Sequence, residues 1–247
     1  MSEIQKTLIP GRILGFQVGY SRTAVLAETP SGLSCGLAAT LSNPEFEYRC
    51  HPSVKNAGHL LEMNIAELTR LVDSGSFTEV AIGLATINAL LPMDPGKWVN
   101  LKAENYLLQY AADKNIAMVG HFPFIDKLKP AVRNLWVLEL DPREGDLPAS
   151  MAPEILPRAD IVAITATTLI NHTFEGLLKL CQPHSKVMLL GPSTPLSPVF
   201  FDFGVDLLCG TIVTDPKAVM LGLSQGSSSH QLHHAGATKM VTLEKGR

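Results

Sequence analysis

Alternating apolar and polar positions open the chain and predict a small antiparallel sheet. Three extended segments follow one another, and Thr29 to Gly32 supplies turn residues between the second and the third. The segments are 12–20, 23–28 and 33–41. Small residues around Gly36 in the third segment indicate that another element packs closely against it.

The pattern then changes to helical spacing. Apolar residues recur at helical intervals over 53–75, with Ser53 as a candidate N-cap, and residues 78–91 are apolar nearly all round, which predicts a buried helix. Pro92 to Gly96 then breaks the chain. We therefore expect one domain over 1–95 and a second over 96–247.

In the second half, short apolar segments alternate with helical ones, which predicts a doubly wound, parallel sheet of the α/β class. The expected strands are 116–119, 135–140, 160–165, 186–190, 205–209 and 239–243. The expected helices are 127–132, 149–156, 173–181 and 215–224. The polar stretch 226–236 is interpreted as a flexible loop.

Polar residues follow the predicted parallel strands, whose carboxyl ends meet at one edge of such a sheet, where ligands bind. His121 and Glu139 follow the first two strands, Thr168 follows the third, and Gly191 to Pro198 follows the fourth. His121 is either a solvent-facing loop residue or a group for acid–base or ligand chemistry. No GxSxG elbow surrounds Ser193, so a ligand-binding hydroxyl is favoured over a nucleophile; Thr194 lies beside it.

Three further polar residues have two interpretations each. Arg22 is either an ordinary surface residue or a ligand for an anionic group. Asn88 interrupts an apolar helix, so its amide either ties down a loop or faces a cleft between the domains. Asn171 caps the following helix or touches ligand, and capping is favoured.

Cofactor signals are weak. The turn after the first predicted strand lacks two of the three glycines of a dinucleotide fingerprint, although Glu139 lies where a ribose-binding acid is expected. Another nucleotide or S-adenosylmethionine stays open as the alternative. Imidazoles at 230, 233 and 234 and the pairs Cys50-His51 and Cys181-x-x-His184 are candidate ligands for a divalent transition metal. Their spacing does not match a permanent four-ligand zinc site.

Composition and charge argue against nucleic acid, membrane and secretion as the setting of this protein. The net charge is −3 and Lys and Arg form no stripe, which argues against nucleic acid. No apolar run reaches the length of about 18 residues that a membrane helix requires. The first residues do not resemble a signal peptide, and the four cysteines show no CxxC spacing. We therefore expect a cytoplasmic protein with free thiols, either monomeric or a homo-oligomer.

Two runs carry a family resemblance. ADIVAITATTLINHTFEGLLKL and the later KVMLLGPSTPLSPVFFDFGVDLLCGTIVTDP resemble the C-terminal domain of the putative heavy-metal chelation family. The opening strands, GLSCGL and AIGLATINALLP resemble the N-terminal domain found with it. The resemblance implies an enolase-N-terminal-like α+β domain, a Rossmann-like domain and a cleft between them. It implies these cleft residues: Asn88, Thr168, Asn171, Gly191, Ser193 and Thr194. Ala166 stands where the family leads us to expect glycine, and its methyl group would narrow a close backbone approach to ligand.

These observations favour a protein that binds a small molecule or a metal complex in a cleft between its domains. The alternatives are a nucleotide- or S-adenosylmethionine-dependent enzyme and a non-catalytic interaction module.

Overall fold

The computed structural model describes residues 1–41, 54–99 and 102–246. The chain divides into two compact units. The first consists of Met1–Pro95, Pro192–Ser197 and Gly210–Met240, and the second of Gly96–Gly191, Pro198–Cys209 and Val241–Arg247. Segments from late in the sequence thus complete the first unit.

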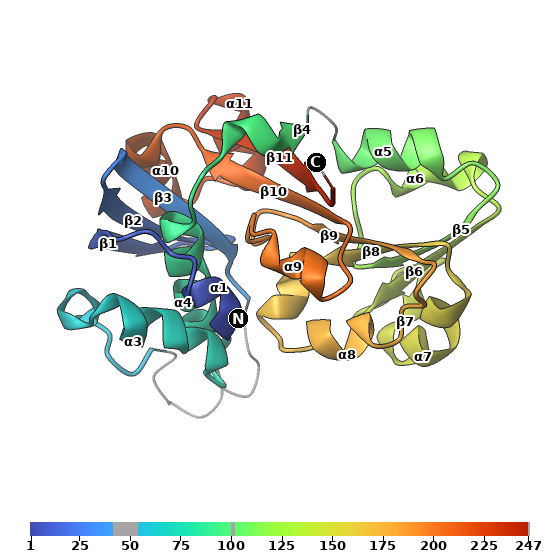
Figure 1. Cartoon of the computed structure of the whole chain (residues 1–247), viewed down its shortest axis with the longest axis horizontal. Coiled ribbons are helices and arrows are strands. Elements are labelled where there is room, and N and C mark those ends of the chain that lie inside the picture. Colours follow the sequence, from blue (N-terminus) through green and yellow to red (C-terminus); the bar gives the residue numbers. More distant parts are fainter. Residues whose placement is uncertain (42–53, 100–101, 247) are drawn as a thin grey trace. The chain divides into compact units, whose positions relative to one another are not determined.

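The first unit contains the predicted antiparallel sheet, in the order β1-β2-β3. Its strands are β1 (Arg12–Val18), β2 (Arg22–Thr29) and β3 (Gly32–Ala39). Helix α4 (Phe77–Leu90) covers one face, and α10 (Pro216–Ser224) covers the other (Figure 1). Alternate residues of β3 serve the two faces: Ser34 and Gly36 contact α4, whereas Cys35 and Leu37 join the α10 cluster.

Gly36 sets the distance between β3 and α4. A Cβ atom added there would lie 2.0 Å from the carbonyl oxygen of Ala85 and 2.3 Å from the amide nitrogen of Ala89. The predicted close approach to this strand is therefore confirmed. It brings Asn88, on the same turn of α4, within hydrogen-bonding distance of the backbone of β3.

The predicted helix over 53–75 is wrong, because the described part of this segment is broken into short pieces. These are a 3-10 turn (Leu60–Glu62), α3 (Ile65–Arg70) and a second 3-10 turn (Leu71–Asp73). Asn64 forms a capping box with Glu67 and begins α3. The candidate cap Ser53 lies outside the described residues, as does the Cys50-His51 pair.

The predicted α/β class is confirmed: the chain carries an eight-stranded, largely parallel sheet in the order β4-β11-β10-β9-β8-β5-β6-β7. From β5 the chain winds outward through β6 and β7, and from β8 it winds the other way. The order therefore reverses between β5 and β8, which is the doubly wound arrangement. The antiparallel β4–β11 pair forms one edge. The strands are β4 (Trp98–Val99), β5 (Asn115–Val119), β6 (Asn134–Glu139), β7 (Leu147–Pro148), β8 (Ile161–Thr165), β9 (Lys186–Leu190), β10 (Leu207–Val213) and β11 (Thr238–Glu244).

The helices of the second half are mostly shorter than predicted. Prolines and 3-10 turns interrupt the segments expected at 127–132 and 149–156. The helices are α5 (Ala103–Tyr110), α6 (Ile125–Leu128), α7 (Ala152–Ile155), α8 (Phe174–Leu178), α9 (Val199–Asp202) and α11 (Ser229–His234), and α1 (Ser2–Gln5) opens the chain. The flexible loop predicted over 226–236 is wrong, since α11 occupies its centre. None of the described helices is both long and apolar enough to cross a membrane.

Candidate functional site

The segment that follows Gly191 belongs to the first unit, where Ser193 is tied to β3 and α4. The Ser193 hydroxyl accepts a hydrogen bond of 2.8 Å from the amide of Ala39. The Asn88 amide donates to the carbonyl of Leu37 at 2.8 Å and to the carbonyl of Ser193 at 3.3 Å. Asn88 therefore ties this segment to the sheet, as one of its two interpretations predicted.

Three polar atoms around this segment have no hydrogen-bond partner among the described residues. They are the hydroxyl oxygen of Thr194, Oδ1 of Asn88 and Nε of Arg22. Each atom is buried, and Thr194 as a residue is only 2 % exposed. Buried polar groups are normally paired, because an unsatisfied one costs about 1–3 kcal/mol.

The three residues are connected through the backbone of β3 and of Ser193. Arg22 is the register partner of Ala39 in the β2–β3 ladder, and Ala39 donates to Ser193, the residue before Thr194. Asn88 binds the carbonyl of the same Ser193. The three unpaired atoms thus belong to residues that are linked through the backbones of β2, β3 and Ser193.

Arg22 is partly buried at the start of β2. One terminal nitrogen donates to the carbonyl of Ser21 at 2.6 Å. Burial lowers the pKa of the Arg22 guanidinium from its ordinary value. A guanidinium stays charged even so, and a buried charge is stabilised by a bound anion.

A second group of predicted residues lies in the other unit, where the strand order reverses. Gly120 directly follows β5 and has φ +103°, and a Cβ atom there would lie 2.9 Å from a methyl carbon of Thr165, at the end of β8. Only glycine fits both the backbone angle and the contact. The ends of β5 and β8 therefore meet at the place where α/β sheets usually bind ligands.

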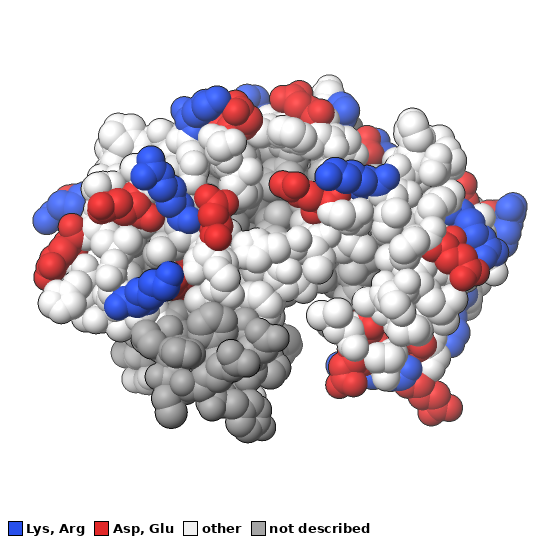
Figure 2. Space-filling view, turned by 90° about the horizontal axis from the view of Figure 1, so that it is seen from below, with Lys and Arg blue, Asp and Glu red and all other residues white. Residues whose placement is uncertain are grey.

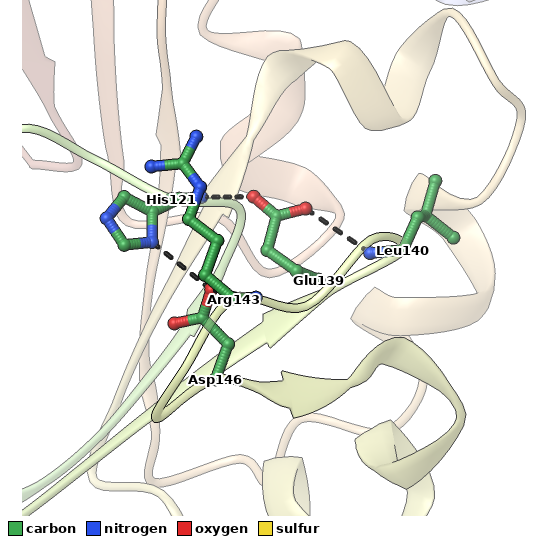
Figure 3. Close-up of polar contacts among 5 residues, drawn as sticks. All are labelled: His121, Glu139, Leu140, Arg143 and Asp146. Atoms are coloured by element: carbon green, nitrogen blue, oxygen red, sulfur yellow. Dashed lines mark hydrogen bonds and ion pairs between the residues drawn. The ribbon is translucent and has the colours of Figure 1, made fainter.

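His121 and Glu139 are brought together at this edge (Figure 3). The Glu139 carboxylate accepts from the amide of His121 at 2.6 Å and from the amide of Leu140 at 3.3 Å. Nδ1 of His121 lies 3.3 Å from a carboxylate oxygen of Asp146, whose side chain is 5 % exposed. The same Asp146 oxygen accepts from the amide of Arg143 at 3.1 Å. Asp146 thus orients the imidazole, in the way that a carboxylate orients a general base.

Sequence reasoning missed Asp146. It lies in the loop between β6 and β7, and it meets His121 only because the loop turns back at Gly145, where φ is +89°. A glycine beside an acid was the available signal, but it is common in loops and does not name a partner.

The remaining predicted residues lie near the ends of strands and make local contacts. The Thr168 hydroxyl donates to the carbonyl of Thr165 at 2.6 Å. Asn171 accepts from the amide and the hydroxyl of Thr173, which is the N-cap residue of α8, so its side chain binds the residue that begins the helix without itself being the N-cap. Gly191 has φ +120° and open space around its α-carbon, so the backbone angle requires the glycine.

The described residues offer no metal centre built from three or more side chains. No group of three or more His, Cys, Asp or Glu side chains that could hold a metal ion occurs within residues 1–41, 54–99 and 102–246. Burial raises the pKa of the Cys35 thiol to about 12, and those of Cys181 and Cys209 to about 11. Burial thus favours the neutral thiol at all three positions.

The described residues also lack the usual features of a nucleotide site. Both carboxylate oxygens of Glu139 already accept backbone hydrogen bonds, whereas a ribose-binding acid would offer them to ligand. Helix α6, after the first parallel strand, has four residues and provides little dipole for a pyrophosphate. On the face drawn in Figure 2, Lys and Arg side chains lie scattered among Asp and Glu, and the described residues form no extended basic patch there.

Comparison with known proteins covers nearly the whole chain. Residues 103–242 match the DUF364 family and residues 2–91 match DUF4213, and both families carry the description "Putative heavy-metal chelation". An uncharacterised protein of Methanocaldococcus jannaschii is 29 % identical over 94 % of this chain and 90 % of its own length.

Two crystal structures of DUF364 proteins of unknown function share the fold, each with a TM-score of 0.82. The Desulfitobacterium hafniense protein is 24 % identical and covers 98 % of this chain and 97 % of its own. The Pyrococcus horikoshii protein is 23 % identical and covers 98 % and 95 %. The family resemblance noted from the sequence is confirmed: the chain belongs to the DUF364 family, described as "Putative heavy-metal chelation", and carries a DUF4213 region at residues 2–91.

Proposed function

We propose that the protein binds a small polar molecule at the Arg22, Asn88 and Thr194 atoms that have no protein partner. The unpaired Thr194 hydroxyl, in a residue that is 2 % exposed, is the observation that carries this proposal. A ligand that completes these hydrogen bonds removes the cost of leaving buried polar atoms unpaired.

The three atoms define the chemistry of the ligand. The Arg22 nitrogen donates, so it takes an anionic oxygen, and Oδ1 of Asn88 accepts, so it takes an N–H or O–H group. The Thr194 hydroxyl can do both. A molecule that places an anionic oxygen beside such a donor is an α-hydroxycarboxylate, an α-aminocarboxylate or a hydroxamate.

These ligand classes are also chelators of metal ions, because they offer two neighbouring donor atoms. The described residues provide no cluster of three metal ligands, so we propose that the protein recognises the organic chelator, and that a metal arrives as part of its complex. This proposal names a ligand class, the organic chelator, for the chelation role with which the family is described.

The Thr194→Val variant tests the proposal, with Thr86→Val as its matched control. Both threonines are buried, but the Thr86 hydroxyl donates to the carbonyl of Ile82 at 2.8 Å. Without ligand we expect Thr194→Val to leave stability unchanged or raise it, and Thr86→Val to lower it by about 1 kcal/mol. Denaturant unfolding of the ligand-free variants measures both effects.

The binding half of the test is a thermal-shift panel of citrate, malate, glutamate and acetohydroxamate, each with and without Ni²⁺. A ligand at ~100 times its Kd stabilises the wild type by ~2.7 kcal/mol. We expect this stabilisation to be lost in Thr194→Val and kept in Thr86→Val. A ligand that stabilises wild type and Thr194→Val equally would place binding elsewhere, and mass spectrometry of the intact protein would show any ligand retained from expression.

A further inference from the structure

Helix α11 is held firmly although it has only six residues. Ser228 and Gln231 form a capping box at its start, and Gly236, with φ +71°, follows its end. Leu232 is 4 % exposed and packs in the cluster with Val219 and Leu223 of α10. The opposite side of α11 is thereby fixed toward solvent.

His230 and His234 lie one turn apart on that exposed side. Their Nε2 atoms are 3.1 Å apart, and the ring centroids are 4.2 Å apart. Two imidazole nitrogens that share one metal ion at 2.0–2.1 Å lie about 2.9 Å apart at a right angle and about 3.3 Å apart at the tetrahedral angle. The observed separation is that of a hydrogen bond between the two rings, and it also falls between these values, so a metal ion in place of the shared proton requires no change of this distance.

The third histidine of the helix is directed elsewhere. Nδ1 of His233 lies 3.2 Å from the carbonyl oxygen of Thr238, at the start of β11. His233 therefore has the same chemistry and the same helix as the other two, but it does not share their pair geometry. It is a matched internal control.

We propose that His230 and His234 form an open, two-imidazole site for a borderline divalent transition metal such as Ni²⁺ or Zn²⁺. Imidazole suits these ions, and residues at i and i+4 on a helix are neighbours that can chelate one ion together. Water fills the remaining coordination positions, since the described residues place no third ligand there. The ion is thus exchangeable, unlike a structural zinc held by four side chains. The proposal is independent of the ligand site at Thr194.

Calorimetric titration of the intact protein with NiCl₂ tests this site. Variants His230→Ala and His234→Ala each leave one imidazole, and we expect each to weaken the Ni²⁺ affinity on the order of tenfold or more, because the chelate is lost. His233→Ala should bind as the wild type does. ZnCl₂ should give the same ranking of the four proteins.

Amide hydrogen exchange of the wild type provides a readout that needs no variant. An ion that bridges one turn holds the helix closed, so Ni²⁺ should slow exchange in 229–234 and leave exchange in α8 unchanged. The proposal is overturned if the His230→Ala/His234→Ala double variant keeps the stoichiometry and affinity of the wild type. It is equally overturned if His233→Ala weakens binding as much as the other two, or if Ni²⁺ leaves exchange in α11 unchanged.

Discussion

A single thiol gives the clearest pH dependence of this molecule. Cys35 is 7 % exposed, and burial raises its pKa from 9.0 to about 12. In the unfolded chain the thiol ionises near pH 9, while in the folded chain it stays neutral until about pH 12. The stability that this thiol contributes is therefore complete below pH 9 and falls by ~1.4 kcal/mol per pH unit above it.

Urea unfolding between pH 8 and pH 10.5 measures this slope, with Cys35→Ala as the control. The variant should lose less stability per pH unit than the wild type over the same interval. Equal slopes would mean that Cys35 ionises at the same pH in both states.

Residue identity alone located several polar candidates but not their partners. Asn88 is unusual in the sequence because its amide interrupts an apolar helix, and Ser193 is unusual because its hydroxyl lies between prolines. Their hydrogen bond joins residues 105 positions apart in the chain, so no local pattern contains it. The absence of a partner for Thr194 is likewise a property of the packed structure.

At the scale of elements, the contact between β3 and α4 depends on one glycine. Gly36→Ala would place a carbon 2.0 Å from a backbone oxygen of α4, and backbone cannot move aside as a flexible side chain can. We expect a loss of about 3 kcal/mol or more of unfolding free energy. The control is Gly176→Ala in α8, where nothing lies within 4 Å and alanine should stabilise by about 0.5–1 kcal/mol. Thermal or denaturant unfolding compares the two, and a tolerated Gly36→Ala would show that α4 can shift.

Periodicity predicted the elements that bury apolar surface and was less successful for those that local chemistry defines. The long apolar helix α4 and the parallel strands were evident, because burial on all sides leaves a continuous apolar run. Helix α11 was missed because its composition is polar and only Leu232 is buried. Its capping box, Ser228 with Gln231, was present in the sequence but lies in a stretch rich in serine and glycine, which favoured a loop.

At the scale of the whole molecule, the fragment 1–95 tests whether the first unit depends on later segments. In the complete chain, Cys35 and Leu37 pack on Val219 and Leu223, which the fragment lacks. One face of its sheet would be exposed, so we expect the fragment to bind a hydrophobic dye and to unfold without a cooperative transition. Calorimetry of the fragment beside the intact chain decides, and a sharp transition for 1–95 alone would contradict the expectation.

The sequence predicted an α/β protein with a break near Pro95, but it did not reveal which later segments return to the first unit. Strand and helix patterns are local, whereas the assignment of 192–197 and 210–240 depends on contacts across more than a hundred residues. The two predicted site groups, at Ser193 and at His121, accordingly belong to different units.

The shared use of late segments has a consequence for inheritance. The DUF364 match, 103–242, contains 192–197 and 210–240, which complete the unit that begins with the DUF4213 region. A gene that kept only the DUF4213 region would encode the β1-β2-β3 sheet without α10, which covers one of its faces, and a gene that kept only the DUF364 region would encode α10 without the sheet. Recombination that replaced one region would pair the β1-β2-β3 sheet with an α10 from another protein, whose side chains would have to fit that sheet. We therefore expect the two regions to have been inherited together and to have diverged together.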